Sequence, residues 1–391
     1  MNEGPPGPSN MVRVGDKRMI QTVLSSRERL TRLFNGQDID RIPIWLLAPY
    51  HRLGCYADIY DLECYKPIVD AIDKYCDTFD RRGFNMGFCY NGNPEIKWEH
   101  SEEDNAGNHI IKDILRYKDM SLMKYVSTGK DGTKVKPLIE DVDELKKIVD
   151  IPYVPPSPDV SKFFREQEEL GDKGLMMVDI GDPLMPLYNL TSAENFSLWT
   201  ATDYDKILSF LDAIYDRVLY AYKYLLDRNV GDVFFIVGAE FAGPPLVSPT
   251  KFRDLSVRYV KGIVDLIRGY GKKSIVHYHG NLYKVLAGMK EINPDGLHTI
   301  EAPPIGDCTI TQAREALGKD MVLIGNIQYD DLVRKDKDEI EQMIKDAIGE
   351  GKSGRFILSP TAGPYETFIN EKTVENYLAF INAGIRYGRV E

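Results

Sequence analysis

The stretch Ser274-Ile-Val-His-Tyr-His-Gly-Asn281 has the pattern of a buried strand that ends in polar side chains. A β-branched pair precedes two histidines, and a Gly-Asn pair follows at the point where a helix is expected to begin. Alternate residues of a strand point to the same face of a sheet. His277 and His279 are therefore predicted to approach one point from one side.

The rest of the chain repeats this order of an apolar strand followed by a helix. Strands are predicted at residues 41–48, 83–89, 175–180, 233–239, 274–278, 296–300, 321–325 and 356–359. Helices are predicted from Ser25 to just before Gly36 and at about residues 57–79, 203–228, 248–269, 281–292, 309–317 and 336–350. Eight such units predict a (β/α)8 TIM barrel, one α/β domain that spans residues 25–391.

Two segments fall outside this repeat. Residues 1–24 contain Gly4-Pro-Pro-Gly-Pro-Ser9 and lack apolar periodicity, which predicts a flexible N-terminal arm or lid segment. Residues from about 91 to 158 carry short apolar pairs and a Lys130-Asp-Gly-Thr133 turn. This pattern predicts a β-hairpin insertion after the second strand, within the barrel domain.

Composition narrows the classes of function. The 391 residues contain 49 Lys and Arg against 60 Asp and Glu, a net charge of -11 with no basic block. This balance argues against a nucleic-acid or anionic-membrane partner. No apolar run reaches the roughly 18 residues that span a bilayer, and the first residues lack a signal-peptide core, so a cytoplasmic protein is expected. The five cysteines form no C-x-x-C pair and predict reduced, mostly buried thiols.

A carboxylate completes the pattern at the end of the next strand. Glu301 ends the apolar run Gly296-Leu-His-Thr-Ile-Glu301, 22 residues after His279. Two imidazoles and one carboxylate from neighbouring strand ends form the ligand set of a catalytic zinc with one open position. Sites of this type also hold iron or cobalt. The alternative is that His277, His279 and Glu301 are hydrogen-bonded strand-end residues without a metal.

Other polar and aromatic residues follow the predicted strands, where barrel enzymes carry their chemistry. Asp179 and Asp182 lie at the end of the third predicted strand and just after it. Glu240 is a candidate base or fourth ligand, and a carboxylate bound only by backbone N–H groups is the alternative. Asn326 is a second catalytic candidate, with packing or a hydrogen bond to a metal ligand as its alternative. Trp45 is expected in the core. An aromatic-lined substrate pocket is predicted from Tyr50, His51, Tyr90, Tyr188, Phe241 and Tyr365.

Several short motifs together resemble the uroporphyrinogen decarboxylase superfamily. They are Ser26-Arg-Glu-Arg29, Asn35-Gly36, Asp40-Arg-Ile-Pro43, Ser248-Pro249, Gly325-Asn326, Glu375-Asn376 and Ala383-Gly-Ile-Arg-Tyr-Gly388. The resemblance spans residues 25 to 388 and rests on the order and spacing of the motifs. It implies a barrel with its active site at the carboxyl ends of the strands.

Two positions indicate the branch that the chain resembles. Porphyrinogen decarboxylases carry Arg-Gln-Ala-Gly-Arg-Tyr after the first strand, where this chain has Leu47-Ala-Pro-Tyr-His-Arg-Leu53. The cobamide-dependent methyltransferases carry His-x-Cys-Gly-Asn after the fifth strand and a further Cys after the eighth. Here His279 replaces the first Cys and Ala362 the second. The spacing to Glu301 also resembles the zinc site of cobalamin-independent methionine synthase. The resemblance implies a zinc ion and a corrinoid carried by a partner protein.

The missing thiolates favour one direction of methyl transfer. Imidazole and carboxylate ligands leave zinc a stronger Lewis acid than thiolates do. The expected reaction is transfer of methyl from a small methoxylated, aromatic donor to a Co(I) corrinoid protein, as in the methyltransferase component of an O-demethylase. The alternatives are methyl transfer from a methylcobamide to a thiol, a lyase or hydrolase that uses the same metal, and a catalytically silent barrel. The sequence is also compatible with a homodimer.

Overall fold

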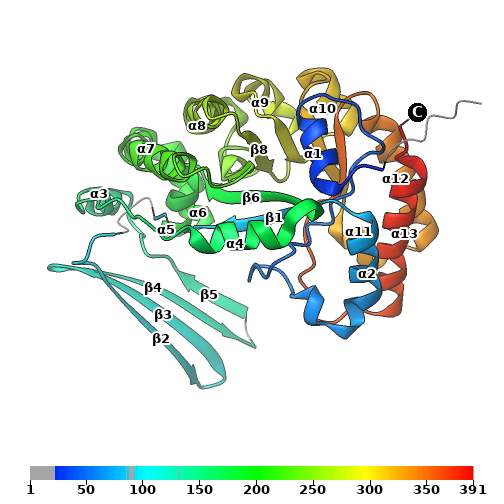
Figure 1. Cartoon of the computed structure of the whole chain (residues 1–391). Coiled ribbons are helices and arrows are strands. Elements are labelled where there is room, and N and C mark those ends of the chain that lie inside the picture. Colours follow the sequence, from blue (N-terminus) through cyan, green and yellow to red (C-terminus); the bar gives the residue numbers. More distant parts are fainter. Residues whose placement is uncertain (1–22, 85, 88–91, 131, 391) are drawn as a thin grey trace, which may run out of the picture.

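The computed structural model describes residues 23–84, 86–87, 92–130 and 132–390. Seven parallel strands form one curled sheet in the order β1-β6-β7-β8-β9-β10-β11 (Figure 1). From β6 to β11, neighbours in the sheet are also consecutive strands of the chain, as short crossovers favour, whereas a separate antiparallel sheet lies between β1 and β6. The strands are β1 (Thr78–Gly83), β6 (Gly174–Gly181), β7 (Val233–Val237), β8 (Lys273–Tyr278), β9 (Gly296–Thr299), β10 (Val322–Ile327) and β11 (Phe356–Pro360).

Helices follow the strands and pack on the outside of the curled sheet (Figure 1). The N-terminal helix begins where it is predicted, because the Ser25 hydroxyl accepts a hydrogen bond from the Glu28 N–H. The helices are α1 (Ser26–Phe34), α2 (Lys66–Tyr75), α3 (Leu145–Val149), α4 (Ser161–Leu170), α5 (Leu184–Leu190), α6 (Ala193–Thr202), α7 (Tyr204–Leu226), α8 (Arg258–Gly269), α9 (Leu286–Ile292), α10 (Ile310–Leu317), α11 (Tyr329–Arg334), α12 (Lys337–Gly351) and α13 (Glu371–Tyr387).

The first predicted strand, residues 41–48, forms no ladder and contributes isolated bridges only. Ile44 bridges Leu358 of β11 in parallel, and the Asp77 N–H just before β1 donates to the Ile44 carbonyl. Pro43 has no N–H to donate, and Leu47 has a φ of 58°, so the segment cannot extend as a strand. The segment therefore touches both edges of a seven-stranded sheet. That arrangement is consistent with a TIM-like barrel, and the eight-stranded barrel stays a prediction.

The second strand lies earlier in the chain than predicted. The strand lies at Thr78–Gly83, so it begins five residues before the predicted range 83–89, of which residues 85, 88 and 89 lie outside the described residues. The helix expected over 57–79 is confined to Lys66–Tyr75 and short turns. The strand was missed because Asp80-Arg81-Arg82 gives it a charged middle. Those charges are paired: Arg82 lies 2.7 Å from Glu166 of α4, and Asp80 lies 2.6 Å from His51.

The segment predicted as a hairpin insertion holds a four-stranded antiparallel sheet. Its order is β2-β3-β4-β5, and it projects from the curled sheet and its helices (Figure 1). The chain enters this sheet after β1 and returns at β6, its neighbour in the parallel sheet. The strands are β2 (Lys97–Asn105), β3 (Asn108–Tyr117), β4 (Met120–Gly129) and β5 (Gly132–Lys136).

The apolar core has two parts. The larger part lies between the strands and the surrounding helices. The smaller part fills the inside of the curled sheet, with one or two residues from each of its strands except β9. Trp45 belongs to the smaller part, as predicted, and lies 5.0 Å from the ring of Phe79 and 6.3 Å from that of Phe235. This inner core closes the amino-terminal side of the sheet interior, so that polar side chains remain at the carboxyl ends.

A buried ion network anchors α1 and the segment 41–45 to the start of β1. Arg29 donates to Asp40 at 2.6 Å and to Asp77 at 2.7 Å. Asp77 also accepts from Arg41 at 2.6 Å and from the Ile44 N–H at 2.9 Å. Two of the short sequence motifs quoted above are therefore structural, because they join the first helix to the sheet.

Within the described residues, none of the helices combines the length and apolar character needed to cross a bilayer. Cys55, Cys64, Cys76 and Cys308 are free thiols, in agreement with the predicted absence of disulfides. Only Cys308 among them is fully buried, so the expectation of mostly buried thiols was wrong. Cys89 lies outside the described residues.

Candidate functional site

The predicted metal ligands lie together at the carboxyl ends of β8 and β9. His277 is in β8, His279 follows it directly, and Glu301 follows β9. The His279 Nδ1 is 3.1 Å from Glu301 Oε1, and the Gly280 N–H donates to Glu301 Oε2 at 2.6 Å. The ring centroids of His277 and His279 are 4.5 Å apart. The i, i+2 spacing thus brings the two imidazoles side by side, as predicted.

A third histidine, which sequence reasoning did not single out, lies against this pair. His298 is in β9, directly opposite His277 in the parallel ladder. The Nδ1 atoms of His277 and His298 are 2.9 Å apart, and His298 Nε2 is 3.5 Å from the Pro360 carbonyl oxygen. His298 stands alone within an apolar run, so no spacing in the sequence indicated its role.

Burial and local charge give the three histidines different properties. Burial lowers the pKa of His277 well below its usual value, and the charges of His298, His279 and Arg81 act in the same direction. Burial likewise lowers the pKa of His298. Burial alone would lower the pKa of His279, but the hydrogen bond and charge of Glu301 raise it above the usual value. Burial therefore favours neutral rings for His277 and His298, whereas Glu301 favours the protonated ring of His279.

The Glu301 carboxylate is held in its ionised form. Burial alone would raise the pKa of Glu301, but the hydrogen bond and charge of His279 and the Gly280 N–H lower it. Its side chain is only 6% exposed, against 42% for His279. Because a metal ligand must be deprotonated, binding of an ion to this pair would release a proton from His279.

The donor types fit zinc, and the spacing fits in part. Two ligands on one tetrahedral zinc lie about 3.3 Å apart, close to the 3.1 Å between His279 Nδ1 and Glu301 Oε1. Across the described residues, however, no set of three His, Cys, Asp or Glu side chains converges as a metal site. His277 faces His298 with its Nδ1, which leaves Nε2 as the nitrogen that could reach an ion.

Two further buried carboxyl groups follow β6 and β7, and one of them, Glu240, lies near His279. Glu240 is in the short 3₁₀ turn Ala239–Ala242 after β7, and its Oε2 accepts from the Gly238 N–H at 3.1 Å. Burial raises the pKa of Glu240, against the lowering effect of the His279 charge. Burial and the charge of Glu240 raise the pKa of Asp182 well above its usual value. Both carboxyls can therefore hold protons, and the backbone-bound alternative for Glu240 is present together with its place near His279.

Arg81 of β1 brings an arginine side chain to the site. It was not predicted there because β1 was placed too far along the chain. Its guanidinium forms an ion pair with Asp179 at the end of β6 and donates to the Tyr56 hydroxyl at 2.7 Å. It also lies over the ring of Phe235, 4.8 Å from the centroid. The alternation of Phe79 and Arg81 along β1 puts both on the inside of the curled sheet.

The predicted aromatic residues fall into two groups at this end of the sheet. Tyr188 of α5 and Phe241 are stacked, with centroids 3.8 Å apart and planes 9° apart. Tyr365 is 55% exposed after β11, and its ring lies 5.5 Å from Tyr56 and 5.7 Å from Tyr329. These aromatic surfaces follow β6, β7 and β11, on either side of the histidine strands in the sheet order.

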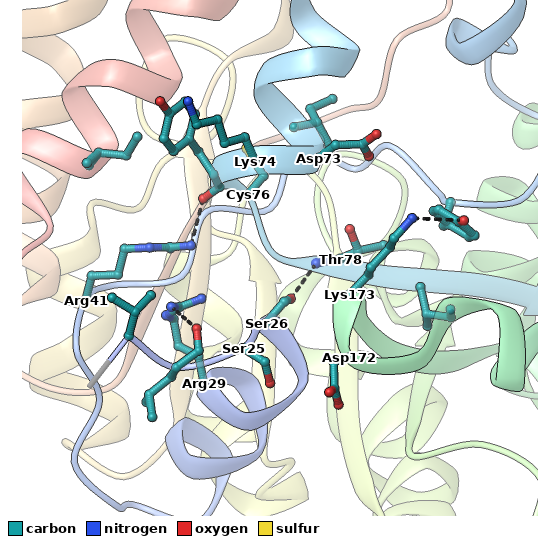
Figure 2. Close-up of a pocket in the computed structure, with 17 residues that line it drawn as sticks. Ser25, Ser26, Arg29, Arg41, Asp73, Lys74, Cys76, Thr78, Asp172 and Lys173 are labelled. Atoms are coloured by element: carbon teal, nitrogen blue, oxygen red, sulfur yellow. Dashed lines mark hydrogen bonds between the residues drawn. The ribbon is translucent and has the colours of Figure 1, made fainter. Parts of the chain in front are cut away.

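The other predicted substrate residues are not brought to the histidines. Tyr50 lines a cavity of about 640 Å³, and its hydroxyl accepts from Lys173 at 3.0 Å (Figure 2). This cavity includes Thr78 and Lys173, at the amino ends of β1 and β6, opposite the candidate site. His51 bonds Asp80 at 2.6 Å and Glu169 of α4 at 3.0 Å, on the helix side of β1.

Two calls remain. Asn326 lies in β10, two strands from His277, and its Cα partner is Ser359 of β11. A catalytic role for Asn326 therefore stays a prediction. Tyr90 lies outside the described residues.

The comparisons with known proteins place the chain in a family. The model of the uroporphyrinogen decarboxylase (URO-D) family matches residues 115–386, which include the histidine strands and Glu301. A methyltransferase from Methanosarcina mazei shares the fold, with a TM-score of 0.58 and 17% identity over 93% of this chain and 99% of that chain. A B12-independent methionine synthase from Shewanella has a TM-score of 0.44 and 11% identity over 88% and 97%. Curated protein sequences give no match. The chain belongs to the uroporphyrinogen decarboxylase family, as its motifs predicted.

Proposed function

We propose that the chain is a zinc-dependent methyltransferase that moves a methyl group from a small methoxylated, aromatic donor to a Co(I) corrinoid on a partner protein. The observation that carries the proposal is the His279–Glu301 pair, 3.1 Å apart, with His277 beside it at the carboxyl ends of the strands. In a barrel-like fold, this is the end that holds catalytic groups.

Two findings support the methyltransferase class over the decarboxylase class. The chain shares its fold with the Methanosarcina methyltransferase over 93% of its length. The segment His277-Tyr-His-Gly-Asn281 stands where the cobamide-dependent branch carries His-x-Cys-Gly-Asn, and the cationic segment of the porphyrinogen decarboxylases is replaced after residue 46.

His277, His279 and Glu301 would hold the zinc ion. When bound there, zinc supplies a Lewis acid that stabilises the negative charge on the oxygen that loses the methyl group. The protein orients the ligands itself: the Gly280 N–H fixes the Glu301 carboxylate, and Glu301 holds the ring of His279 in place until the ion replaces the His279 proton. Such hydrogen bonds to metal ligands typically matter for affinity and activity.

A nearby carboxyl group can balance the proton in this reaction. The ether O–CH3 bond breaks, the methyl group forms a bond to cobalt, and Co(I) becomes methyl-Co(III). The donor oxygen leaves as a phenolate, which must gain a proton. Glu240 lies near His279, and burial raises its pKa, so that its carboxyl group can deliver that proton to the phenolate oxygen.

The aromatic groups suit a planar donor. The Tyr188–Phe241 stack and the Tyr56–Tyr365–Tyr329 group present ring surfaces near the carboxyl ends of the strands. Such surfaces bind an aromatic ring through offset or edge contacts and exclude water from the reacting oxygen. We assign them the role of holding the donor while its methyl group faces the partner protein.

The test is a half-reaction with spectroscopic detection. Zinc-loaded protein is mixed with a reduced corrinoid protein, or with cob(I)alamin, and a panel of methoxyaromatics. The proposal expects the Co(I) spectrum to change to that of methyl-Co(III) with a matching loss of donor. The Glu301→Ala variant serves as the control and should leave the spectrum unchanged. Methylation of a free thiol from methylcobalamin, with no donor consumed, would mean that the transfer runs in the opposite direction.

A further inference from the structure

His298 and His277 form a hydrogen bond between two imidazole rings on adjacent strands. Their Nδ1 atoms are 2.9 Å apart, the ring centroids are 5.0 Å apart, and the ring planes differ by 21°. The ring planes are therefore nearly parallel, and the two Nδ1 atoms lie within hydrogen-bond distance. In such a contact one ring donates its N–H to the lone pair of the other, so one of the two Nδ1 atoms carries the shared proton.

The far side of His298 decides which ring carries that proton. Its Nε2 faces the Pro360 carbonyl oxygen at 3.5 Å, and a carbonyl oxygen can only accept a hydrogen bond. The Nε2 of His298 must then carry a proton. His298 is 1% exposed and packs against the rings of Trp45 and Phe235, where an unpaired positive charge would be costly.

The proton positions follow from these two contacts. A neutral His298 with its proton on Nε2 has a lone pair on Nδ1. His277 must then donate its Nδ1–H to His298, which leaves a lone pair on the Nε2 of His277. The opposite arrangement would point the Nε2 lone pair of His298 at the lone pairs of the Pro360 oxygen, and that contact is repulsive.

We propose that His298 is a positioning residue that fixes the tautomer and ring orientation of His277 through the Pro360 carbonyl. The relay runs from Pro360 O to His298 Nε2–H, and from His298 Nδ1 to His277 Nδ1–H. His277 then presents an unprotonated Nε2 to the metal ion. The inference rests on the proposed function, in which His277 is a ligand, and it adds a role for a residue that contacts neither metal nor substrate.

The role resembles one that carboxylates and carbonyl groups fill in many metal sites. A ligating histidine usually donates its second N–H to such a group, which sets the tautomer and makes the ligand more basic. Glu301 already bonds His279, but the group within hydrogen-bond distance of His277 Nδ1 is an imidazole. An imidazole can take this part only if its own tautomer is set, and the Pro360 carbonyl does so.

The first test reads the tautomer without any metal. Metal-free protein is labelled with ¹⁵N-histidine, and the six histidines of the chain keep the spectrum interpretable. Spectra of His277→Ala and His298→Leu assign the two rings. The inference expects a protonated Nδ1 and an unprotonated Nε2 on His277, and the reverse on His298. A protonated Nε2 on His277 would overturn it.

The second test measures zinc affinity by competition with a chromophoric chelator. His298→Leu keeps the volume near that of imidazole but removes the acceptor, and the affinity is expected to fall about 10- to 100-fold. In His298→Asn, the side-chain oxygen can stand close to the Nδ1 position and accept from His277, so the affinity should stay near that of the wild type. His109→Leu, on β3 of the antiparallel sheet, is the matched control and should change nothing.

The outcomes separate this inference from the proposed function. If folded His298→Leu binds zinc as tightly as the wild type while His277→Ala loses it, the positioning role is wrong and the metal site stands. If His277→Ala and His279→Ala both keep full zinc, the proposed metal site fails. The tautomer measurement on the metal-free wild type decides the relay itself, even where His298→Leu does not fold.

Discussion

Asp77→Asn should destabilise the protein more than any substitution of a surface carboxylate. The Asp77 side chain has no exposed surface and accepts from Arg29 at 2.7 Å and from Arg41 at 2.6 Å. It also accepts from the Ile44 N–H at 2.9 Å, in the segment that touches both edges of the sheet. An asparagine keeps one acceptor oxygen but leaves two arginines without their shared negative charge.

The expected size of the effect comes from the buried ion network. Removal of one partner from a buried ion pair costs about 3–5 kcal/mol. An unfolding entropy of about 2.1 cal/mol/K per residue gives roughly 0.8 kcal/mol/K for a chain of 391 residues. The melting temperature should therefore fall by about 4–6 °C if the chain unfolds as one unit.

The assay is urea and thermal denaturation beside a matched control. Asp320 also pairs with an arginine, Arg355 at 3.1 Å, but its side chain is 95% exposed. Asp320→Asn should cost about 0–1 kcal/mol. If the two variants unfold at the same urea concentration, the network does not hold the first helix and the segment 41–45 to the sheet.

Three further predictions concern the metal site, the pH dependence and the N-terminal arm. Glu301→Ala should lose most bound zinc, measured by elemental analysis, without a large change in melting temperature. His279→Cys should still bind zinc in the same measurement. Full zinc content in Glu301→Ala, or no zinc in His279→Cys, would contradict the proposed site. Burial alone would raise the pKa of Asp40, but hydrogen bonds from Arg29 and the Leu24 N–H lower it. Asp40 therefore stabilises the fold fully above its unfolded pKa of about 3.9 and loses this effect as pH falls through the lowered folded value. The stability deficit of Asp40→Asn should then be constant above about pH 5 and shrink below pH 4, and a deficit that grows in acid would refute the sign. Deletion of residues 1–22 should leave a soluble, folded chain, and insoluble protein would contradict this.

The strands of the parallel sheet differ in how clearly their sequences predict them. Strands such as β7, Val233–Val237, are continuous apolar runs bounded by glycine, as expected of a strand buried on both faces. The position of β1 was predicted wrongly, because the charged run Asp80-Arg81-Arg82 is stable in a buried strand only when Glu166 and other residues distant in the sequence pair with it. Local composition cannot report such tertiary pairing.

The site shows the same division. The proximity of His277, His279 and Glu301 could be predicted because their spacing follows the geometry of parallel strands. Their role as metal ligands stays a prediction. The roles of His298 and Arg81 depend on cross-strand contacts that no spacing within one strand encodes.

Tyr50 and His51 were predicted to line the substrate pocket because they follow the first predicted strand. The positive φ of Leu47 and the proline at position 49 instead accompany a path that leaves this face. Tyr50 thus lies in the cavity at the opposite end.

The most direct test of the central claim is the cobalt spectrum during a single turnover. Zinc-loaded protein, a Co(I) corrinoid protein and a methoxyaromatic donor are mixed anaerobically, and cobalt and donor are followed together. We predict one methyl-Co(III) formed for each donor demethylated, at a rate that Glu301→Ala abolishes. Unchanged Co(I) across the whole panel, from protein that carries one zinc at His277, His279 and Glu301, would contradict the proposed function.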